Sequence, residues 1–493
     1  MVASPKNFPL LAELLAEQQR LDTPVARFST AHDHGTALAP QLIPLTRPGP
    51  GEQYGFEVDL DSCTGCKACV SACHSLNGLD DDETWRDVGL LVSPNRAQPF
   101  TQTVTTACHH CADPACLNGC PVLAYEKDPV TGIVRHLDDQ CIGCSYCVLK
   151  CPYDVPKFSA RLGIVRKCDM CHSRLAVGEA PACAQACPTQ AITIVNVSVT
   201  QPTKLRAQPG FLPGAPDPDY TQPTTRYVSR RALPQNLVAA DATQLRVQPA
   251  HWPLVVMLTL LPAAVGLQLA ALPVLRLSTF HPQLLAVAAA LGALGLAASV
   301  FHLGQPRRAW RIFLGWRKSW LSREAMLFGA WIPLTALAAL APQFVQLSTF
   351  NVQLLVTAAA ALGCLGLVCS AMIYIDTRRQ LWRAAQTFPR FLGTAMTVAL
   401  AFAAPFAAVA VLAVMLAVES RTFFGRATPA RLQRGPLARA ALTRDVFGMI
   451  ALIALAVAPA WLALIPLIAG ELTERYLFFR AVDAPKMPGL PAA

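Results

Sequence analysis

The chain has 493 residues, enough for two or three domains, and a formal net charge of +10. Residues 1–195 carry 15 Lys and Arg against 21 Asp and Glu, a net of −6, whereas residues 196–493 carry 26 against 10, a net of +16. The basic excess lies in short loops between apolar runs, a pattern typical of membrane proteins. This distribution argues against nucleic-acid binding as the reason for the positive charge.

The N-terminal segment 1–53 predicts one short amphipathic helix, over 8–20, followed by an arm rich in Pro and Gly. No apolar core of signal-peptide length follows a basic start, and no twin-arginine pair precedes the helix. We therefore expect the next domain to stay in the cytoplasm unless a partner carries it across the membrane. Cysteines in a reducing compartment favour metal ligation over disulfides.

Sixteen of the eighteen cysteines lie within 54–195, and they form four groups of four. The first and third groups have the spacing C-x2-C-x2-C-x3-C, whereas the second widens the middle gap to four residues and the fourth widens it to eleven. In chain order the groups are Cys63, Cys66, Cys69, Cys73; Cys108, Cys111, Cys116, Cys120; Cys141, Cys144, Cys147, Cys151; and Cys168, Cys171, Cys183, Cys187.

This spacing suits iron–sulfur clusters. Three thiolates two residues apart can wrap three corners of a cubane, and a fourth at the start of a helix reaches a different cluster. Zinc is the alternative, because CxxC pairs are common in zinc sites. Four such groups, three of them followed by Pro, favour iron and sulfide over zinc. The segment 54–195 is therefore predicted to be an α+β ferredoxin-like domain with four 4Fe–4S clusters, although spacing alone leaves open which groups exchange ligands.

Histidines and tyrosines flank several of these cysteines. We expect the histidines to hydrogen-bond or pack near the clusters rather than to bind metal; they are His74, His109, His110 and His172. We expect the tyrosines to pack and to exclude water; they are Tyr125, Tyr146 and Tyr153.

Residues 196–250 contain eight prolines and few apolar runs, so they are predicted to form an extended linker. Residues 251–482 are predicted to be an all-α polytopic membrane domain, and 483–493 a C-terminal tail. Segments long and apolar enough to cross hydrocarbon as helices are 253–275, 282–303, 325–342 and 351–375.

Two further stretches, 391–419 and 446–479, are each long for one helix and short for two, so six to eight helical segments are expected. With eight crossings, the loops 304–323, 376–390 and 420–445 share one face and hold sixteen Lys and Arg. The positive-inside bias therefore favours eight segments.

His302 ends the second apolar run, in FHLGQPRRAW, and Glu324 begins the third, in SWLSREAMLFG. A His and a carboxylate at one membrane face can hydrogen-bond the two hydroxyls of a quinol and accept its protons as electrons leave. The alternative is structural: a His that caps one helix and a Glu paired with a nearby Arg.

The sequence from FEVDLDSCTGCKACVSACHSLNG to CPTQAI resembles the iron–sulfur subunits of molybdopterin oxidoreductases such as dimethyl sulfoxide reductase. In that family the outer cysteine groups exchange their fourth ligands, and so do the inner groups. The resemblance implies four clusters, with ligands Cys63, Cys66, Cys69 and Cys187; Cys168, Cys171, Cys183 and Cys73; Cys108, Cys111, Cys116 and Cys151; and Cys141, Cys144, Cys147 and Cys120.

The membrane domain resembles the anchor subunit of the same family, in HLGxPxRA, SWLSRE, HWPLVVMLTL and GELTERYLFF. In that family the His and the Glu of the first two motifs belong to the menaquinol site. The resemblance thus implies a quinol site at His302 and Glu324, with Gly304 and Arg308 as neighbours, and no haem. The acidic and basic residues of the last motif are expected to form a structural pair or a surface contact; they are Glu471, Glu474 and Arg475.

The sequence as a whole predicts a redox subunit that passes electrons from membrane quinol through four clusters to a separate molybdopterin-containing catalytic subunit. It carries no terminal-substrate site of its own. Two alternatives stay open: a conduit that runs in reverse, from a substrate dehydrogenase to quinone, and a pure anchor with an attached polyferredoxin. The charged loops predict that the cluster domain faces the cytoplasm at the inner membrane. A cytoplasmic catalytic partner would make an assimilatory nitrate reductase a more natural candidate than a respiratory sulfoxide reductase.

Overall fold

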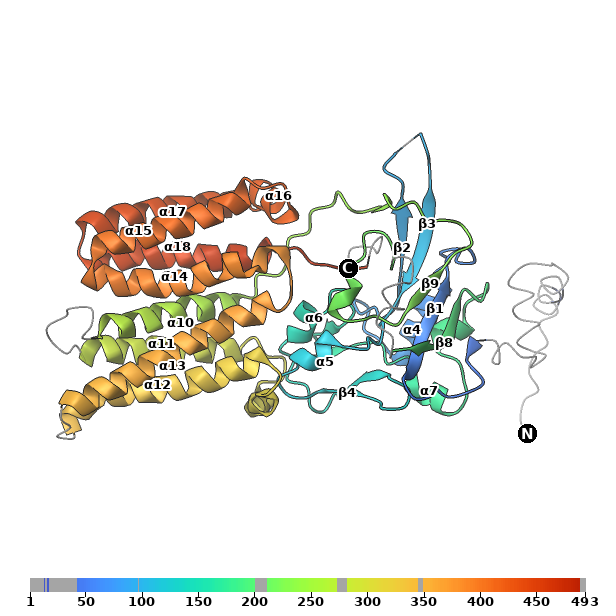
Figure 1. Ribbon diagram of the computed structural model, residues 1–493, viewed down its shortest axis with the longest axis horizontal. Coiled ribbons are helices and arrows are strands. Elements are labelled where there is room, and N and C mark those ends of the chain that lie inside the picture. The colour runs from blue at the N-terminus through green and yellow to red at the C-terminus, as the bar shows by residue number, and fades with distance from the viewer. Residues whose placement is uncertain are drawn as a thin grey trace, which may run out of the picture.

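The computed structural model describes residues 13, 16, 42–95, 97–199, 211–272, 282–344 and 349–487. The predicted helix over 8–20, most of the arm that follows it and the last residues of the tail lie outside this part of the chain. The described residues form two regions, a cysteine domain of strands and short helices and a domain of long helices (Figure 1).

The cysteine domain is α+β, as predicted, and contains two three-stranded sheets. In the first, β1 (Glu52–Asp59) pairs antiparallel with β8 (Ile192–Ser198) and parallel with β9 (Arg226–Val228). In the second, β2 (Asp87–Val92) lies between β3 (Thr101–Thr106) and β10 (Val238–Ala239). Two hairpins complete the domain: β4 (Tyr125–Lys127) with β5 (Val134–His136), and β6 (Lys157–Ser159) with β7 (Ile164–Arg166).

Short helices begin within or next to the cysteine motifs. They are α4 (Ala68–Asn77), α5 (Ala115–Gly119), α6 (Tyr146–Lys150), α7 (His172–Ala176) and α8 (Ala182–Gln185). The residues just before α4, α6 and α7 have left-handed backbones, with φ of 63° at Lys67, 56° at Ser145 and 48° at Cys171. Such residues turn the chain sharply, so each motif closes a tight loop before its helix points away.

The segment predicted as a linker takes part in the cysteine domain. It contributes β9 and β10, each of two or three residues, as edge strands of the two sheets. The ring of Phe211 also packs edge-on against Tyr153 and Tyr227. The prolines account for the shortness of these strands, because proline cannot donate to a ladder of hydrogen bonds.

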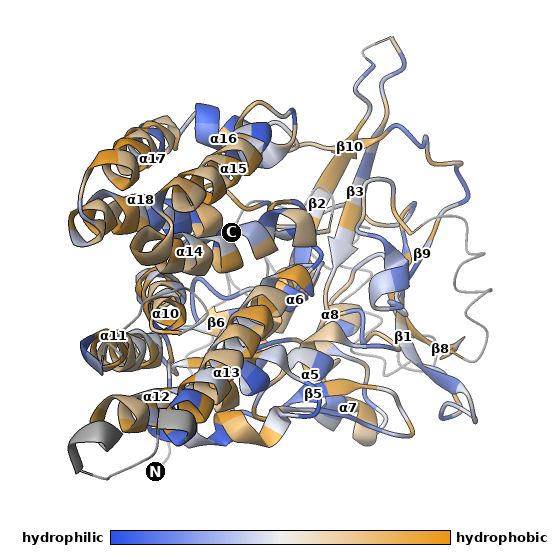
Figure 2. Ribbon diagram, turned by 60° about the vertical axis from the view of Figure 1, so that its left-hand side comes forward, coloured by the Kyte–Doolittle hydropathy of each residue, from blue (hydrophilic) through white to orange (hydrophobic). Residues whose placement is uncertain are grey.

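The helical domain contains eight long helices within the described residues. They are α10 (Trp252–Ala270), α11 (Pro282–Val300), α12 (Trp320–Phe344), α13 (Thr349–Ile375), α14 (Ala384–Ala403), α15 (Pro405–Phe423), α17 (Ala438–Val457) and α18 (Ala460–Arg480). Six are long and apolar enough to cross a membrane, and α14 and α18 are the two that carry more polar residues. Figure 2 shows the long helices largely in the colours of apolar residues.

Each of the two ambiguous stretches forms two helices, separated at a proline. Pro405 is the first residue of α15, and Pro459 precedes α18, which suits the missing amide hydrogen of proline. The helices α14 and α17 begin seven or eight residues before the apolar runs, because Arg390 and Arg444 lie inside them and are buried. Twenty helical residues reach about 30 Å, the thickness of the hydrocarbon core.

The chain enters and leaves the helical domain at the same end. The amide of Gln248, just before α10, donates to the carbonyl of Arg480, the last residue of α18, at 3.2 Å. Beyond α18 the polypeptide returns to the cysteine domain, where Met487 is fully buried in the apolar core. The short helix α16 (Thr428–Arg434) lies at this end too, because Arg431 donates to the carbonyl of Thr243 at 3.2 Å.

Candidate functional site

The sixteen thiols of the cysteine domain gather into four groups, each with three cysteines from one motif and one from another. Burial raises the pKa of Cys63, and the nearby thiolates of Cys69, Cys187 and Cys66 raise it further. Burial raises the pKa of Cys144 as well, and Cys120 is the nearest thiolate that adds to the shift. In both cases the fourth thiol comes from the motif that the resemblance names, and cluster ligation by these groups stays a prediction.

We name the groups by their distance from the helical domain. The proximal site is Cys120, Cys141, Cys144 and Cys147; the second site is Cys108, Cys111, Cys116 and Cys151; the third site is Cys73, Cys168, Cys171 and Cys183; and the distal site is Cys63, Cys66, Cys69 and Cys187. Neighbouring sites are in electrostatic contact. Thiolates of the proximal and second sites raise the pKa of Tyr125. In the same way Cys108 raises the pKa of Cys168, and Cys183 raises the pKa of Cys69.

The residues fit a cubane cluster. Cavities occupy the centres of the second and distal sites, each lined by the four cysteines of its group. Backbone amides point at the sulfurs, as from Gly143 to Cys141 at 3.3 Å and from Ala191 to Cys187 at 3.3 Å.

The helical domain docks on the two loops that carry the proximal site. The amide of Gln305 donates to the carbonyl of Ile142 at 3.0 Å, and the hydroxyl of Ser319 donates to the carbonyl of Gly119 at 2.7 Å. A second contact joins α6 to the end of α13, where the hydroxyl of Tyr146 donates to the carbonyl of Ile373 at 3.0 Å. The proximal site is therefore the one beside the helices.

Three glycines let the two backbones meet at this junction. A Cβ on Gly304 would lie 2.1 Å from the carbonyl oxygen of Gly163, and a Cβ on Gly143 would lie 2.3 Å from the same atom. Both Gly143 and Gly163 also have positive φ, 69° and 64°. Arg308 donates to the carbonyl of Cys141 at 3.2 Å, so Gly304 and Arg308 hold the junction together.

His302 and Glu324 lie at this end of the helical domain, with no hydrogen bond or ion pair between them in the described residues. The ring of His302 hydrogen-bonds the backbone of Cys144 and meets the ring of His251 edge-on, with centroids 5.0 Å apart. Burial lowers the pKa of His302, and the hydrogen bond to Cys144 opposes that shift. Glu324 is buried on α12 and accepts a hydrogen bond from the hydroxyl of Ser370.

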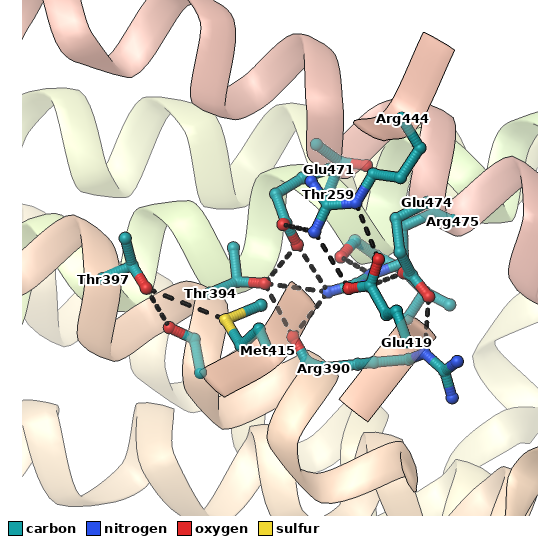
Figure 3. Close-up of polar contacts among 12 residues, drawn as sticks. Thr259, Arg390, Thr394, Thr397, Met415, Glu419, Arg444, Glu471, Glu474 and Arg475 are labelled. Carbon is teal, nitrogen blue, oxygen red and sulfur yellow. Dashed lines mark hydrogen bonds and ion pairs between the residues drawn. The ribbon is translucent and has the colours of Figure 1, made fainter. Parts of the chain in front are cut away.

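Glu471, Glu474 and Arg475 are buried, so the expectation of a surface contact is wrong and the structural alternative holds. They belong to a network of three arginines and three glutamates between α14, α15, α17 and α18 (Figure 3). Arg444 donates to both carboxylate oxygens of Glu419, at 2.8 and 2.9 Å. The remaining pairs are Arg444 with Glu471, Arg475 with Glu471 and Glu474, and Arg390 with Glu474.

Family models match both regions of the protein. A 4Fe-4S dicluster domain matches residues 100–197, a 4Fe-4S binding domain matches 54–75, and the DMSO reductase anchor subunit (DmsC) matches 250–421. The fold and the thiol sites thus define an iron–sulfur electron-transfer subunit fused to a multi-pass membrane anchor.

Curated relatives agree with the family models. The B subunit of the anaerobic dimethyl sulfoxide reductase of Haemophilus influenzae is 37% identical over 181 residues, 35% of this protein and 87% of the relative. Its counterpart from Escherichia coli K12 is 36% identical over 148 residues, which are 28% of this protein and 72% of the relative. The formate dehydrogenase-O iron-sulfur subunit of the same strain is 36% identical over 158 residues, which are 29% of this protein and 52% of the relative. The protein belongs to the DMSO reductase family, as a domain similar to the B subunit fused to a DmsC anchor.

Three residues near these sites escaped the sequence reasoning. His251 lies in the motif HWPLVVMLTL, but nothing in the sequence pairs it with His302, 51 positions away. Lys167 directly precedes a cysteine, and that adjacency was the available signal. Arg86 lies between motifs, and its burial has no local signature.

Proposed function

We propose that this protein oxidises membrane quinol beside His302 and Glu324 and passes the electrons through four 4Fe–4S clusters to a separate molybdopterin-containing catalytic subunit. The carrying observation is the junction. The backbone of Cys144, a proximal-site cysteine, hydrogen-bonds the ring of His302, and Ser322, two residues before Glu324, donates to the carbonyl of Pro121. Both residues therefore belong to the end of the helical domain that docks on the proximal-site loops.

The four sites give electrons a continuous path away from the helices. The proximal, second, third and distal sites act on one another electrostatically in that order. Cys66 of the distal site is exposed, whereas the proximal site is covered by the helical domain. The exposed end is therefore the place for a catalytic subunit to receive electrons, one at a time, from a bound cluster.

The residues of the proposed quinol site can take the two protons of a quinol. The imidazole of His302 interacts with the backbone of Cys144, and one of its ring nitrogens can accept a hydroxyl proton. The carboxylate of Glu324 can accept the second, with the hydroxyl of Ser370 holding it in position. Glu324 is buried, which excludes competing water at that position.

The test is to reduce the clusters with a menaquinol analogue and to monitor the reduction through the loss of their visible absorbance. We expect His302→Ala and Glu324→Gln each to slow reduction at least a hundredfold while iron content and membrane insertion stay parental. Arg307→Gln, which alters an exposed cation of the same loop, is the matched control and should reduce normally. Parental rates in both site variants would favour the pure anchor without quinone chemistry.

A second candidate, the reverse conduit, is favoured by the likeness to the formate dehydrogenase-O iron-sulfur subunit. The same cluster domain therefore also occurs in a protein named for a dehydrogenase. Redox titration separates the two directions: distal-site potentials above that of menaquinone support outward flow to a reductase. Potentials that fall steadily from the proximal to the distal site would support the reverse conduit.

We further propose that the cluster domain faces the cytoplasm. The charged loops lie at the cluster-domain end, but several of their arginines bind that domain directly, as Arg311 does at the carbonyl of Asp139. Docking therefore explains part of the charge bias, and the orientation needs its own test. In a variant without Cys364 and Cys369, Arg307→Cys should resist an impermeant maleimide in intact cells and react after lysis, with Pro459→Cys as the reciprocal probe. Reaction of Arg307→Cys in intact cells would reverse the orientation.

A further inference from the structure

Two basic side chains are buried among the cluster thiols of the cysteine domain. Arg86 and Lys167 are 2% and 3% exposed. Neither forms an ion pair with a carboxylate in the described part of the sequence. Because an unpaired buried cation is costly, a group that carries negative charge must balance each of them.

Arg86 lies between the third and distal sites. Its guanidinium rests 4.6 Å from the centre of the Phe56 ring, and one nitrogen donates to the hydroxyl of Thr105 at 3.3 Å. Its Nε and second terminal nitrogen have no hydrogen-bond partner among the described residues. The groups that act on it most strongly after burial are the thiolates of Cys183, Cys69, Cys168 and Cys73. Two of its donors are thus free to face the clusters of both sites.

Lys167 lies between the second and third sites. Its ammonium lies 3.6 Å from the sulfur of Cys108, a ligand of the second site, and donates to the carbonyl of Cys168, a ligand of the third, at 2.8 Å. A third hydrogen bond goes to the carbonyl of Val134. These bonds fix the charge between the two sites.

The proximal site has no such cation within the described ranges. Its sulfurs meet Tyr125 beside Cys147 and His136 beside Cys141, and His136 is paired with the carboxylate of Asp138. Arg308, which is partly exposed, donates to the backbone carbonyls of Cys141 and Asp138. Water and salt screen a surface charge far more than a buried one. Lys150, which is buried beside the proximal site, is paired with Asp376. Within the described residues, the two buried cations Arg86 and Lys167, which have no carboxylate partner, therefore lie at the sites away from the membrane.

We propose that Arg86 and Lys167 raise the reduction potentials of the second, third and distal sites relative to the proximal site, and so direct electrons away from the membrane. Reduction of a cluster adds one negative charge, taken from the preceding cluster, which is oxidised. A fixed cation nearby stabilises that charge without any proton transfer. The inference rests on the four-site arrangement of the proposed function but not on the quinol site.

The test is a redox titration with dye mediators, followed by EPR. The proximal signal is identified as the one altered in Cys144→Ser. We expect Lys167→Met to lower the potentials of two other signals, those of the second and third sites. Arg86→Gln should lower those of the third and distal sites, so that the third-site signal responds to both variants. Each fall should be at least tenfold in the reduced-to-oxidised ratio, or about 59 mV for a one-electron couple. The proximal potential should not move.

Two further variants keep the result decisive. Lys167→Gln retains a donor without the charge and should also lower the potentials, whereas Arg86→Lys retains the charge and should largely preserve them. The matched control is the double variant Arg166→Gln/Glu83→Gln, which removes a neutral pair, bonded at 3.0 Å, from the position next to Lys167. Parental potentials in the charge-removing variants, or an equal shift in the control, would overturn the inference. A parental protein with far less than about sixteen iron would instead refute the four-cluster proposal.

Discussion

In the helical domain three buried arginines meet two buried glutamates and one that is partly buried, whereas in the cysteine domain Arg86 and Lys167 lie among cluster thiols. Both regions exclude water from charged groups, and both must neutralise them. The helices do so with their own side chains, because hydrocarbon supplies no counter-charge. The cysteine domain leaves that task to its clusters.

The comparison shows that the two regions depend on iron to different degrees. A charge balanced by a side chain is balanced as soon as the polypeptide folds. A charge balanced by a cluster is balanced only when the cluster is present, so cluster binding and folding become one process.

Removal of iron should unfold the cysteine domain and leave the helical domain folded. Without clusters, two buried cations and sixteen thiols lose their partners, and an uncompensated buried charge costs about 3–5 kcal/mol, against a total stability of about 5–15 kcal/mol. Limited proteolysis after anaerobic chelation should digest residues 54–195 and spare the long helices. Equal resistance of both regions would contradict the contrast.

Removal of one partner from the paired network should destabilise the helical domain alone. Glu471→Gln leaves Arg475 and Arg444 short of a carboxylate, and we expect a loss of about 3–5 kcal/mol. This loss of stability can be measured by thermal unfolding in detergent, monitored through the reactivity of Cys369. The double variant Glu419→Gln/Arg444→Met, which removes a neutral pair, should lose clearly less, and cluster absorbance should persist in both.

A methyl group at the junction should separate the two regions. In Gly304→Ala the new Cβ meets the backbone carbonyl of Gly163, which cannot move aside, and the junction should weaken by about 3 kcal/mol. Quinol should then reduce the clusters slowly while dithionite reduces them at the parental rate. Gly329→Ala, where a Cβ meets open space, is the control.

His251 should make the junction sensitive to acid. Burial lowers its pKa to about 4, and His302 and Arg379 add to the shift. The unfolded protein, with a pKa near 6.5 for this residue, therefore binds more protons between pH 6.5 and 4, and the stabilisation is present above pH 6.5 and is lost as the pH falls. Between pH 7 and 5 the loss should be about 2 kcal/mol. It should disappear in His251→Gln, and an unchanged pH dependence there would exclude this residue as the cause.

Much of the cysteine domain could be predicted from the sequence, because local spacing determines cluster motifs. The loop over Cys141, Cys144 and Cys147 closes within seven residues, and the left-handed turn at Ser145 is part of it. The exchange of fourth ligands depends on how distant segments pack, so it came from the resemblance rather than from the spacing. β9 and β10 are too short to show an alternating pattern, and the prolines around them indicated a linker.

The helical domain shows where apolar periodicity fails. In the sequence alone Arg390 and Arg444 interrupt the apolar pattern, yet each lies inside a helix because a glutamate from another helix neutralises it. Such pairing over more than 20 residues has no local signature. Arg86 was missed for the same reason, since the thiols that act on it belong to two different cysteine motifs, the first and the fourth.

The strap over 211–250 ties the cysteine domain covalently to α10, although the matched families name these parts as two separate subunits, an iron–sulfur subunit and an anchor. A tether of this kind keeps its two ends at an effective concentration of about millimolar, whatever the concentration of the protein. The junction can therefore rely on close glycine contacts and a few hydrogen bonds to backbone carbonyls, which would hold two free subunits together only weakly, and still survive dilution into detergent. Each anchor is also synthesised with one cluster domain, so neither can accumulate as an orphan.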